Sequence, residues 1–96
     1  MLFVLICTDK PNATALRADT RQRHLAYIDA HKDRVKIAGP FTSDDGQAML
    51  GSMIVIEAVD AAAARTFAAN DPYALAGLFQ NVEIKPWRWL IGAPKG

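Results

Sequence analysis

The chain has 96 residues, which is enough for one domain spanning residues 1–96 with one modest hydrophobic core. Its 11 Lys and Arg against 10 Asp and Glu give a net charge of +1, so neither nucleic acid nor an anionic membrane is favoured as a partner. A single cysteine excludes an intrachain disulfide. No apolar run is long enough to span a membrane, and the N-terminus lacks the features of a signal peptide, so a cytoplasmic protein is expected.

The hydrophobic pattern predicts that the chain opens with a strand and a long helix. Residues 2–7 form a short run that is apolar on both faces, which indicates a strand covered on both sides. A helix is expected to start near Asn12 or Thr14, either of which could cap it, and to run to about Lys32.

The inward side of this helix carries a histidine. At 100° per residue, His24 falls on the stripe of mainly apolar residues, so its ring should face the protein interior. Arg17 and Arg21 lie at the edge of the stripe, from where their guanidinium groups could reach water or point into a cleft. Leu25 lies off the stripe, as scattered apolar residues often do.

The next two strands are expected to form a hairpin. Residues 34–41 alternate between apolar and polar, which predicts a strand with one polar face, and Pro40 indicates a sheet edge, a bulge or the end of the strand. Asp45 and Gly46 mark the tip of the turn. Residues 51–58 then form a third strand that is again apolar on both faces.

A helical segment that stops and restarts at a proline follows the hairpin. Asp60 is a good N-cap for an alanine-rich helix over residues 61–69. Asp71 precedes a proline, which disfavours helical backbone at Asp71 and makes it the cap of a short helix from Pro72 to about Leu78.

The last predicted strand covers residues 82–91 and carries Trp87 and Trp89 on one face, and the tail from Gly92 to Gly96 should lack regular structure. The resulting order of elements is βαββαβ. It is the order of α+β, ferredoxin-like folds, which place both helices on one face of an antiparallel sheet.

The number of helices limits how much of the sheet a single chain can cover. Two helices cover one face, yet the first and third strands are apolar on both faces. Soluble monomers rarely expose a patch of this kind. We therefore expect a homodimer in which the open sheet faces of two copies pack together.

Short motifs along the chain stand in the order and spacing of a known family. They are Arg17, Arg21, His24-Leu25, Gly39-Pro40, Gly51-Ser52, Asp71-Pro72-Tyr73, Ala76-Gly77 and Lys85-Pro86-Trp87. In these motifs, over almost its whole length, the chain resembles the YciI-like (YCII-related) proteins. The resemblance implies a dimeric α+β barrel and a more distant similarity to muconolactone isomerase. One family member removes chloride from a chlorinated hydroxyhydroquinone.

The resemblance also implies a site. The family's proposed active site is a His–Asp pair, which by motif falls on His24 and Asp71. No cofactor is expected, because the glycines form no phosphate-binding loop, and no metal, because the two histidines have no Cys or acidic partners at metal spacing. The further candidates for binding a small-molecule substrate are Arg17, Arg21, Ser52 and Tyr73.

Two functions stay open at this point. In one, the protein is a small enzyme without cofactor, in which His24 moves a proton of a cyclic or aromatic metabolite during an elimination, an isomerisation or related lyase chemistry, and Asp71 orients the ring. In the other, it is a dimeric module that binds a small ligand or partner without chemistry. The structural alternatives are a core histidine bonded to a carbonyl and a simple helix cap at Asp71.

Overall fold

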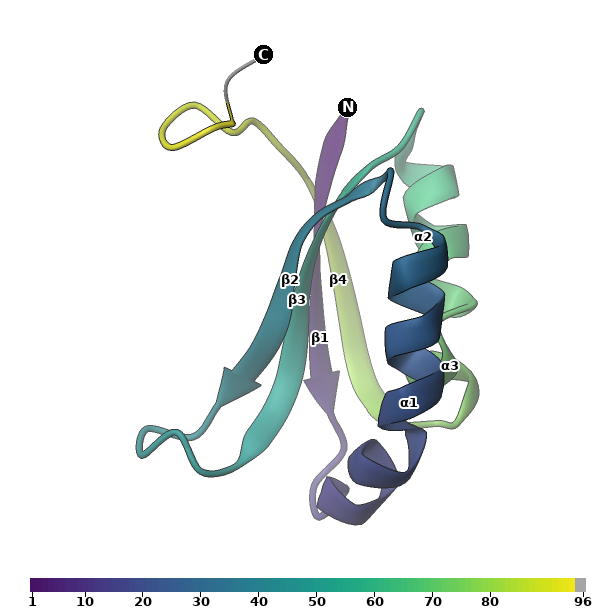
Figure 1. Ribbon diagram of the computed structural model, residues 1–96, viewed down its shortest axis with the longest axis vertical. Helices are drawn as coiled ribbons and strands as arrows, with labels where there is room; N and C mark the ends of the chain where they lie inside the picture. The colour runs from purple at the N-terminus through teal and green to yellow at the C-terminus, as the bar shows by residue number, and fades with distance from the viewer. Residues whose placement is uncertain (95–96) are drawn as a thin grey trace.

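The computed structural model describes residues 1–94, and Lys95 and Gly96, the end of the predicted tail, lie outside the described residues. Within the described residues, three helices lie on one side of a four-stranded sheet (Figure 1). In chain order the elements are β1 (Leu2–Asp9), α1 (Thr14–Ala30), β2 (Val35–Thr42), β3 (Met49–Glu57), α2 (Ala61–Ala69), α3 (Pro72–Leu75) and β4 (Phe79–Trp87).

The strands follow the order β2-β3-β1-β4, and every neighbouring pair is antiparallel. The predicted α+β, ferredoxin-like fold with helices on one face is therefore confirmed. Pro40 and Pro86 lie in the two edge strands, where a residue without an N–H group leaves no central ladder bond unmade. The two strands that are apolar on both faces, β1 and β3, occupy the centre.

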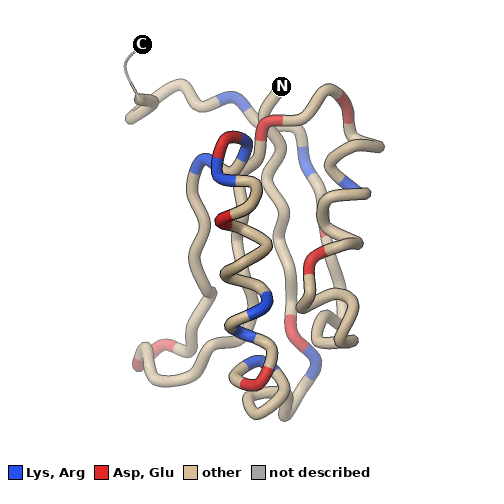
Figure 2. Tube along the Cα trace, turned by 45° about the vertical axis from the view of Figure 1, so that its right-hand side comes forward, with Lys and Arg blue, Asp and Glu red and all other residues tan. Residues whose placement is uncertain are grey.

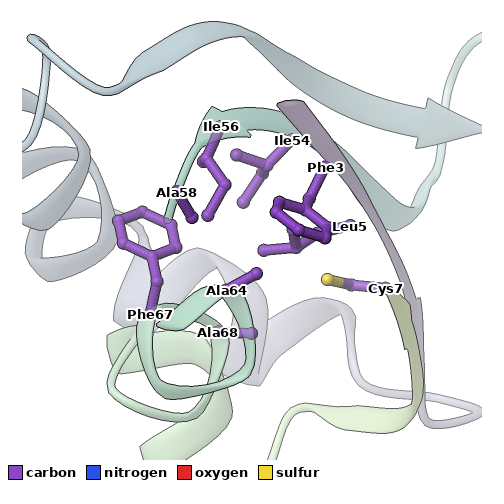
Figure 3. Close-up of a cluster of buried hydrophobic side chains, with 9 residues drawn as sticks. All are labelled: Phe3, Leu5, Cys7, Ile54, Ile56, Ala58, Ala64, Phe67 and Ala68. Atoms are coloured by element: carbon purple, nitrogen blue, oxygen red, sulfur yellow. The ribbon is translucent and has the colours of Figure 1, made fainter. Parts of the chain in front are cut away.

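The hydrophobic core fills the space between the sheet and α2. Alternate residues of β1 and β3 point toward the helices, and the alanines of α2 let its backbone lie close to the strands. The nine side chains that Figure 3 shows in this cluster are Phe3, Leu5, Cys7, Ile54, Ile56, Ala58, Ala64, Phe67 and Ala68.

The last strand begins and ends earlier than the sequence pattern predicts. The prediction was residues 82–91, but pairing with β1 sets both ends of β4. Trp87 pairs with Leu2, where β1 itself begins, so pairing stops there. At the other end, the register shifts between Thr8 and Asp9, which leaves Gln80 of β4 as the extra residue and lets Phe79 join the ladder. Trp89 consequently lies outside the strand, although its ring is 5.6 Å from that of Trp87.

The first helix also differs from the prediction at both ends. α1 ends at Ala30 rather than near Lys32, and its N-cap is Ala13, whose side chain cannot accept a hydrogen bond. Neither Asn12 nor Thr14 caps the helix. Asn12 instead adopts left-handed backbone, with φ of 58°, where the chain turns from β1 into α1.

The hairpin strands shift their pairing at two points. Val35 and Ile37 were expected on the same face of β2, but a register shift between them places Val35 opposite Ile56 and Ile37 opposite Val55. Val35 therefore packs against the core and Ile37 faces away from the helices. The second shift lies near the turn, and β3 starts two residues before the predicted range of 51–58.

Both predicted aspartate caps are confirmed. Asp60 accepts a hydrogen bond from the first turn of α2, and Asp71 accepts one from the backbone N–H of Tyr73 at 2.9 Å. The helix that Asp71 caps ends at Leu75, three residues before the predicted end. Gly77 causes this, because its φ of 79° is a left-handed conformation that ends helices.

Gly51 provides a test of how closely β3 and β1 approach. A Cβ atom at Gly51 would overlap the carbonyl oxygen of Cys7 in the centre of the sheet. We expect Gly51→Ala to lower the free energy of unfolding in urea by roughly 1–3 kcal/mol, the usual cost of overpacking. The matched control is Gly39→Ala in β2, where a Cβ meets no atom within 4 Å. Equal destabilisation by both substitutions would contradict this explanation.

Candidate active site

A cavity of about 290 Å³ lies between α1 and the β2–β3 side of the sheet. It exists because the helices do not cover β2. Ala38 and Pro40 pair with Ile54 and Ser52, so they face the helix side of the sheet, yet both are exposed. The cavity is thus the space that α1 leaves open above the edge strand.

At the inner wall of the cavity, the side chains of His24 and Asp71 are in direct contact. The Nδ1 atom of His24 lies 2.9 Å and 3.0 Å from the two carboxylate oxygens of Asp71. Both residues are buried, with 8% and 1% of their surface exposed. Asp71 accepts its capping hydrogen bond at the same time, so one carboxylate both starts α3 and contacts the histidine.

This contact determines which nitrogen of His24 is available. An ionised carboxylate only accepts hydrogen bonds, so Nδ1 must carry a proton and neutral His24 has its lone pair on Nε2. The side-chain hydrogen bonds of His24 within residues 1–94 all involve Nδ1, and every fully buried side-chain nitrogen or oxygen of these residues has a partner. Nε2 therefore opens onto the cavity that His24 lines.

Tyr73 connects the His24 side of the site with Arg17. Its ring stacks on the His24 ring, with centroids 4.1 Å apart and planes at 17°, and the guanidinium carbon of Arg17 lies 4.6 Å from its centroid. Burial raises the pKa of the Tyr73 hydroxyl, and the positive charges of Arg17 and Arg21 oppose the rise. The phenol is a neutral hydrogen-bond donor at physiological pH.

Arg17 is buried, although the sequence placed it at the edge of the helix stripe. Its Nη2 donates to the carbonyl oxygen of Gly51 at 2.7 Å and to the hydroxyl of Ser52 at 2.6 Å. Its Nε donates to Asp9 at 2.8 Å. The side chain is only 7% exposed, and it lines the cavity.

Sequence reasoning missed Asp9, which lies beyond the predicted first strand of residues 2–7. Its side chain is 5% exposed and forms the buried ion pair with Arg17. The signal was present, because Asp9 lies at the end of a buried strand and Arg17 one turn into the following helix. Only the packing of α1 back over the sheet brings the two groups together.

Two residues at the mouth of the cavity are exposed. Arg21 has no ion pair among the described residues, so its positive charge is available to a ligand. Leu25, which is 42% exposed, lines the same mouth. The sequence pattern predicts a scattered apolar residue here, but Leu25 is part of the cavity wall. Figure 2 shows that α1 carries residues of both signs along its length.

The structure brings all six residues named from the sequence to one place. His24, Arg17, Arg21, Ser52 and Tyr73 line the cavity, and the buried Asp71 lies behind His24. Their roles in chemistry remain predictions. Within residues 1–94 no helix is long and apolar enough to cross a membrane.

Comparison with known proteins agrees with this fold. An antiparallel ferredoxin-like sheet with its helices on one side defines a class of small α+β proteins. The family model "YCII-related domain" matches residues 1–88, so the chain belongs to the YCII-related family. Protein YciI of Escherichia coli is 34% identical over 92% of this chain and 97% of its own length. An uncharacterized protein of Haemophilus influenzae is 30% identical over the same shares.

A solved structure of the same architecture is that of an enzyme. The 5-chloro-2-hydroxyhydroquinone dehydrochlorinase of Burkholderia phenoliruptrix AC1100, in complex with 2,5-dihydroxybenzoquinone, is 33% identical to this chain. The TM-score is 0.83, and the match covers 92% of this chain and 94% of that one.

Cys7 lies next to this site and should be chemically inert. Burial, with the negative charges of Asp71 and Asp9, raises the pKa of its thiol from 9.0 to about 12. We expect no reaction with a thiol reagent at pH 8 in the native state and rapid reaction in urea. Because the unfolded thiol ionises at lower pH, its contribution to stability is complete below pH 9 and falls as the pH rises toward 12. Rapid labelling of native protein would contradict this.

Proposed function

We propose that the protein is a small enzyme without cofactor that moves a proton of a cyclic or aromatic substrate, with His24 as acid or base and Asp71 as its partner. The observation that carries the proposal is the buried contact at Nδ1, which leaves Nε2 facing a cavity. The activity of the similar dehydrochlorinase supports it.

The arrangement accounts for a complete proton transfer. Nε2 takes a proton from a hydroxyl or carbon of the substrate, so that an O–H or C–H bond breaks and an N–H bond forms. The Asp71 carboxylate stabilises the resulting imidazolium. The electron pair left on the substrate either expels a leaving group such as chloride, in an elimination, or takes up the proton at another atom, in an isomerisation.

The size and charge of the site limit the substrate. A volume of about 290 Å³ is at the lower end of small-molecule sites and suits one substituted ring. Ile54 and Leu25 offer apolar contact to such a ring. Arg21 favours a negative charge on it, as a phenolate or enolate would carry.

The test is chloride release from 5-chloro-2-hydroxyhydroquinone, the substrate of the similar enzyme. We expect turnover by the wild type and a loss in kcat of roughly 100-fold or more in His24→Ala and Asp71→Asn, the usual contribution of general acid–base catalysis. The matched control is His31→Ala, because His31 lies on the same side of α1 but bonds the carbonyl oxygen of Tyr27, away from the cavity.

Two other outcomes would decide against this mechanism. Full turnover by both site variants would show that the pair is structural. Binding of 2,5-dihydroxybenzoquinone without turnover by the wild type would favour the non-catalytic binding module.

We also propose that the working form is a homodimer joined through the open sheet faces. Figure 1 shows all helices on one side of the sheet. The opposite face carries apolar side chains on three neighbouring strands, and Ile37 and Phe41 there are 38% and 41% exposed. A second copy would cover them with the same face of its own sheet. The cytoplasmic location stays a prediction from the sequence.

The oligomeric state tests the dimer. We expect the wild type to sediment as a dimer and Ile37→Glu to sediment as a folded monomer, because it places a charge within the proposed apolar interface. Gln22→Glu, which adds the same charge on the exposed side of α1, should remain dimeric. A wild type that is monomeric at all accessible concentrations would refute the interface.

A further inference from the structure

Arg17 is a buried cation with an unused donor. A guanidinium has five N–H groups, one on Nε and two on each terminal nitrogen. Nε donates to Asp9. The two N–H groups on Nη2 are shared among three acceptors, the oxygens of Gly51 and Ser52 at 2.7 Å and 2.6 Å and the Asp9 carboxylate at 3.4 Å. Nη1 has one long contact, 3.5 Å, to the hydroxyl of Tyr73. Among the described residues, at least one N–H of Nη1 therefore has no acceptor.

The Tyr73 hydroxyl is also an unused donor. Its oxygen accepts the long contact from Nη1, and its own proton is donated to none of the described residues. Two donor groups thus lie 3.5 Å apart at the cavity wall. Because the Tyr73 ring stacks on the His24 ring at 4.1 Å, this pair of donors is fixed beside the proposed base.

Asp9 determines which end of Arg17 faces this position. Its carboxylate engages the guanidinium from the side, with 2.8 Å to Nε and 3.4 Å to Nη2. Such a two-point contact fixes the plane of the group, which a single contact does not. With Nε and Nη2 held on the side of β1 and β3, Nη1 is directed toward Tyr73.

We infer that Asp9 positions Arg17 so that Nη1 of Arg17 and the hydroxyl of Tyr73 together bind the anionic oxygen of the substrate. This inference rests on the proposed function. When His24 takes the proton, the electron pair of the broken bond becomes negative charge on a ring oxygen, as phenolate or enolate. Donors already in place at that oxygen stabilise the charge without reorganisation. Asp9 is a positioning residue and touches no substrate.

Whether Asp9→Asn weakens or strengthens the binding of an anion distinguishes a positioning role of Asp9 from a purely electrostatic one. Asp9 is negative and close to the site, so if it acted only through its charge, Asp9→Asn would strengthen the binding of an anion. If it positions Arg17, Asp9→Asn weakens binding, because the amide cannot hold the guanidinium at two points as an acceptor. The effect must then disappear when Arg17 has lost its planar group.

The experiment is a titration with 2,5-dihydroxybenzoquinone, an anion at neutral pH, followed by its visible absorption. We expect Arg17→Lys and Tyr73→Phe each to weaken binding by about tenfold, as the loss of a hydrogen bond to a charged group does. Asp9→Asn should weaken it by about fivefold in the wild-type background and by less than twofold in Arg17→Lys. Asp29→Asn, an exposed acid on the outer side of α1, is the control and should bind as wild type.

The outcomes can be told apart from those of the proposed function. Chloride release in His24→Ala tests the proposed function, whereas quinone affinity in the Arg17, Tyr73 and Asp9 variants tests the donor pair. Tighter or unchanged binding by Asp9→Asn, an equal loss in the Arg17→Lys background, or no binding by the wild type overturns the inference. If Asp9→Asn does not fold, Tyr73→Phe still decides whether the donor pair binds the anion, and wild-type affinity in that variant overturns it. Turnover is not needed for any of these readings.

Discussion

The limited cover that the helices give to the sheet is the constraint on which this structure depends. The helices bury the central strands on one face and leave two surfaces open: the helix side of β2 and the whole opposite face. The first becomes the cavity, bounded by Ala38 and Pro40 instead of by a helix. The second keeps Ile37 and Phe41 exposed and is the basis for the proposed dimer. Both features arise because the helices cover only part of the sheet.

The buried charged groups beside the cavity lose their hydration, and this loss is offset only when each is paired with a group of opposite charge or a hydrogen-bond partner. Isolated ions in such surroundings are strongly disfavoured, and the structure matches each carboxylate with a partner on α1. Asp71 contacts His24, and Asp9 contacts Arg17. The two α1 residues are about two helical turns apart. Tyr73, which touches both, packs the two pairs into one unit, so that α1 and α3 cannot move independently without breaking it.

Much of the fold could be read from residue order, and most errors lay at the ends of elements. Hydrophobic pattern and the aspartate caps placed α2 and the start of α3 correctly, because those signals are local. The ends of β4 depended on where β1 starts and on a register shift near Asp9, and the face of Val35 depended on another register shift. Pairing between distant strands decides such points. The ends of β4 and the face of Val35 therefore cannot be predicted from the local sequence of those segments.

The sequence by itself determined the order of elements, the inward face of His24 and the cap at Asp71, since helical periodicity and the geometry before proline are properties of the local chain. The motifs also named six residues that share one site. Only the tertiary structure decided that Nδ1 of His24 meets Asp71 while Nε2 faces a cavity, and that Arg17 is held by Asp9. These contacts join segments far apart in the chain, and they form because α1 and α3 pack side by side on the same face of the sheet.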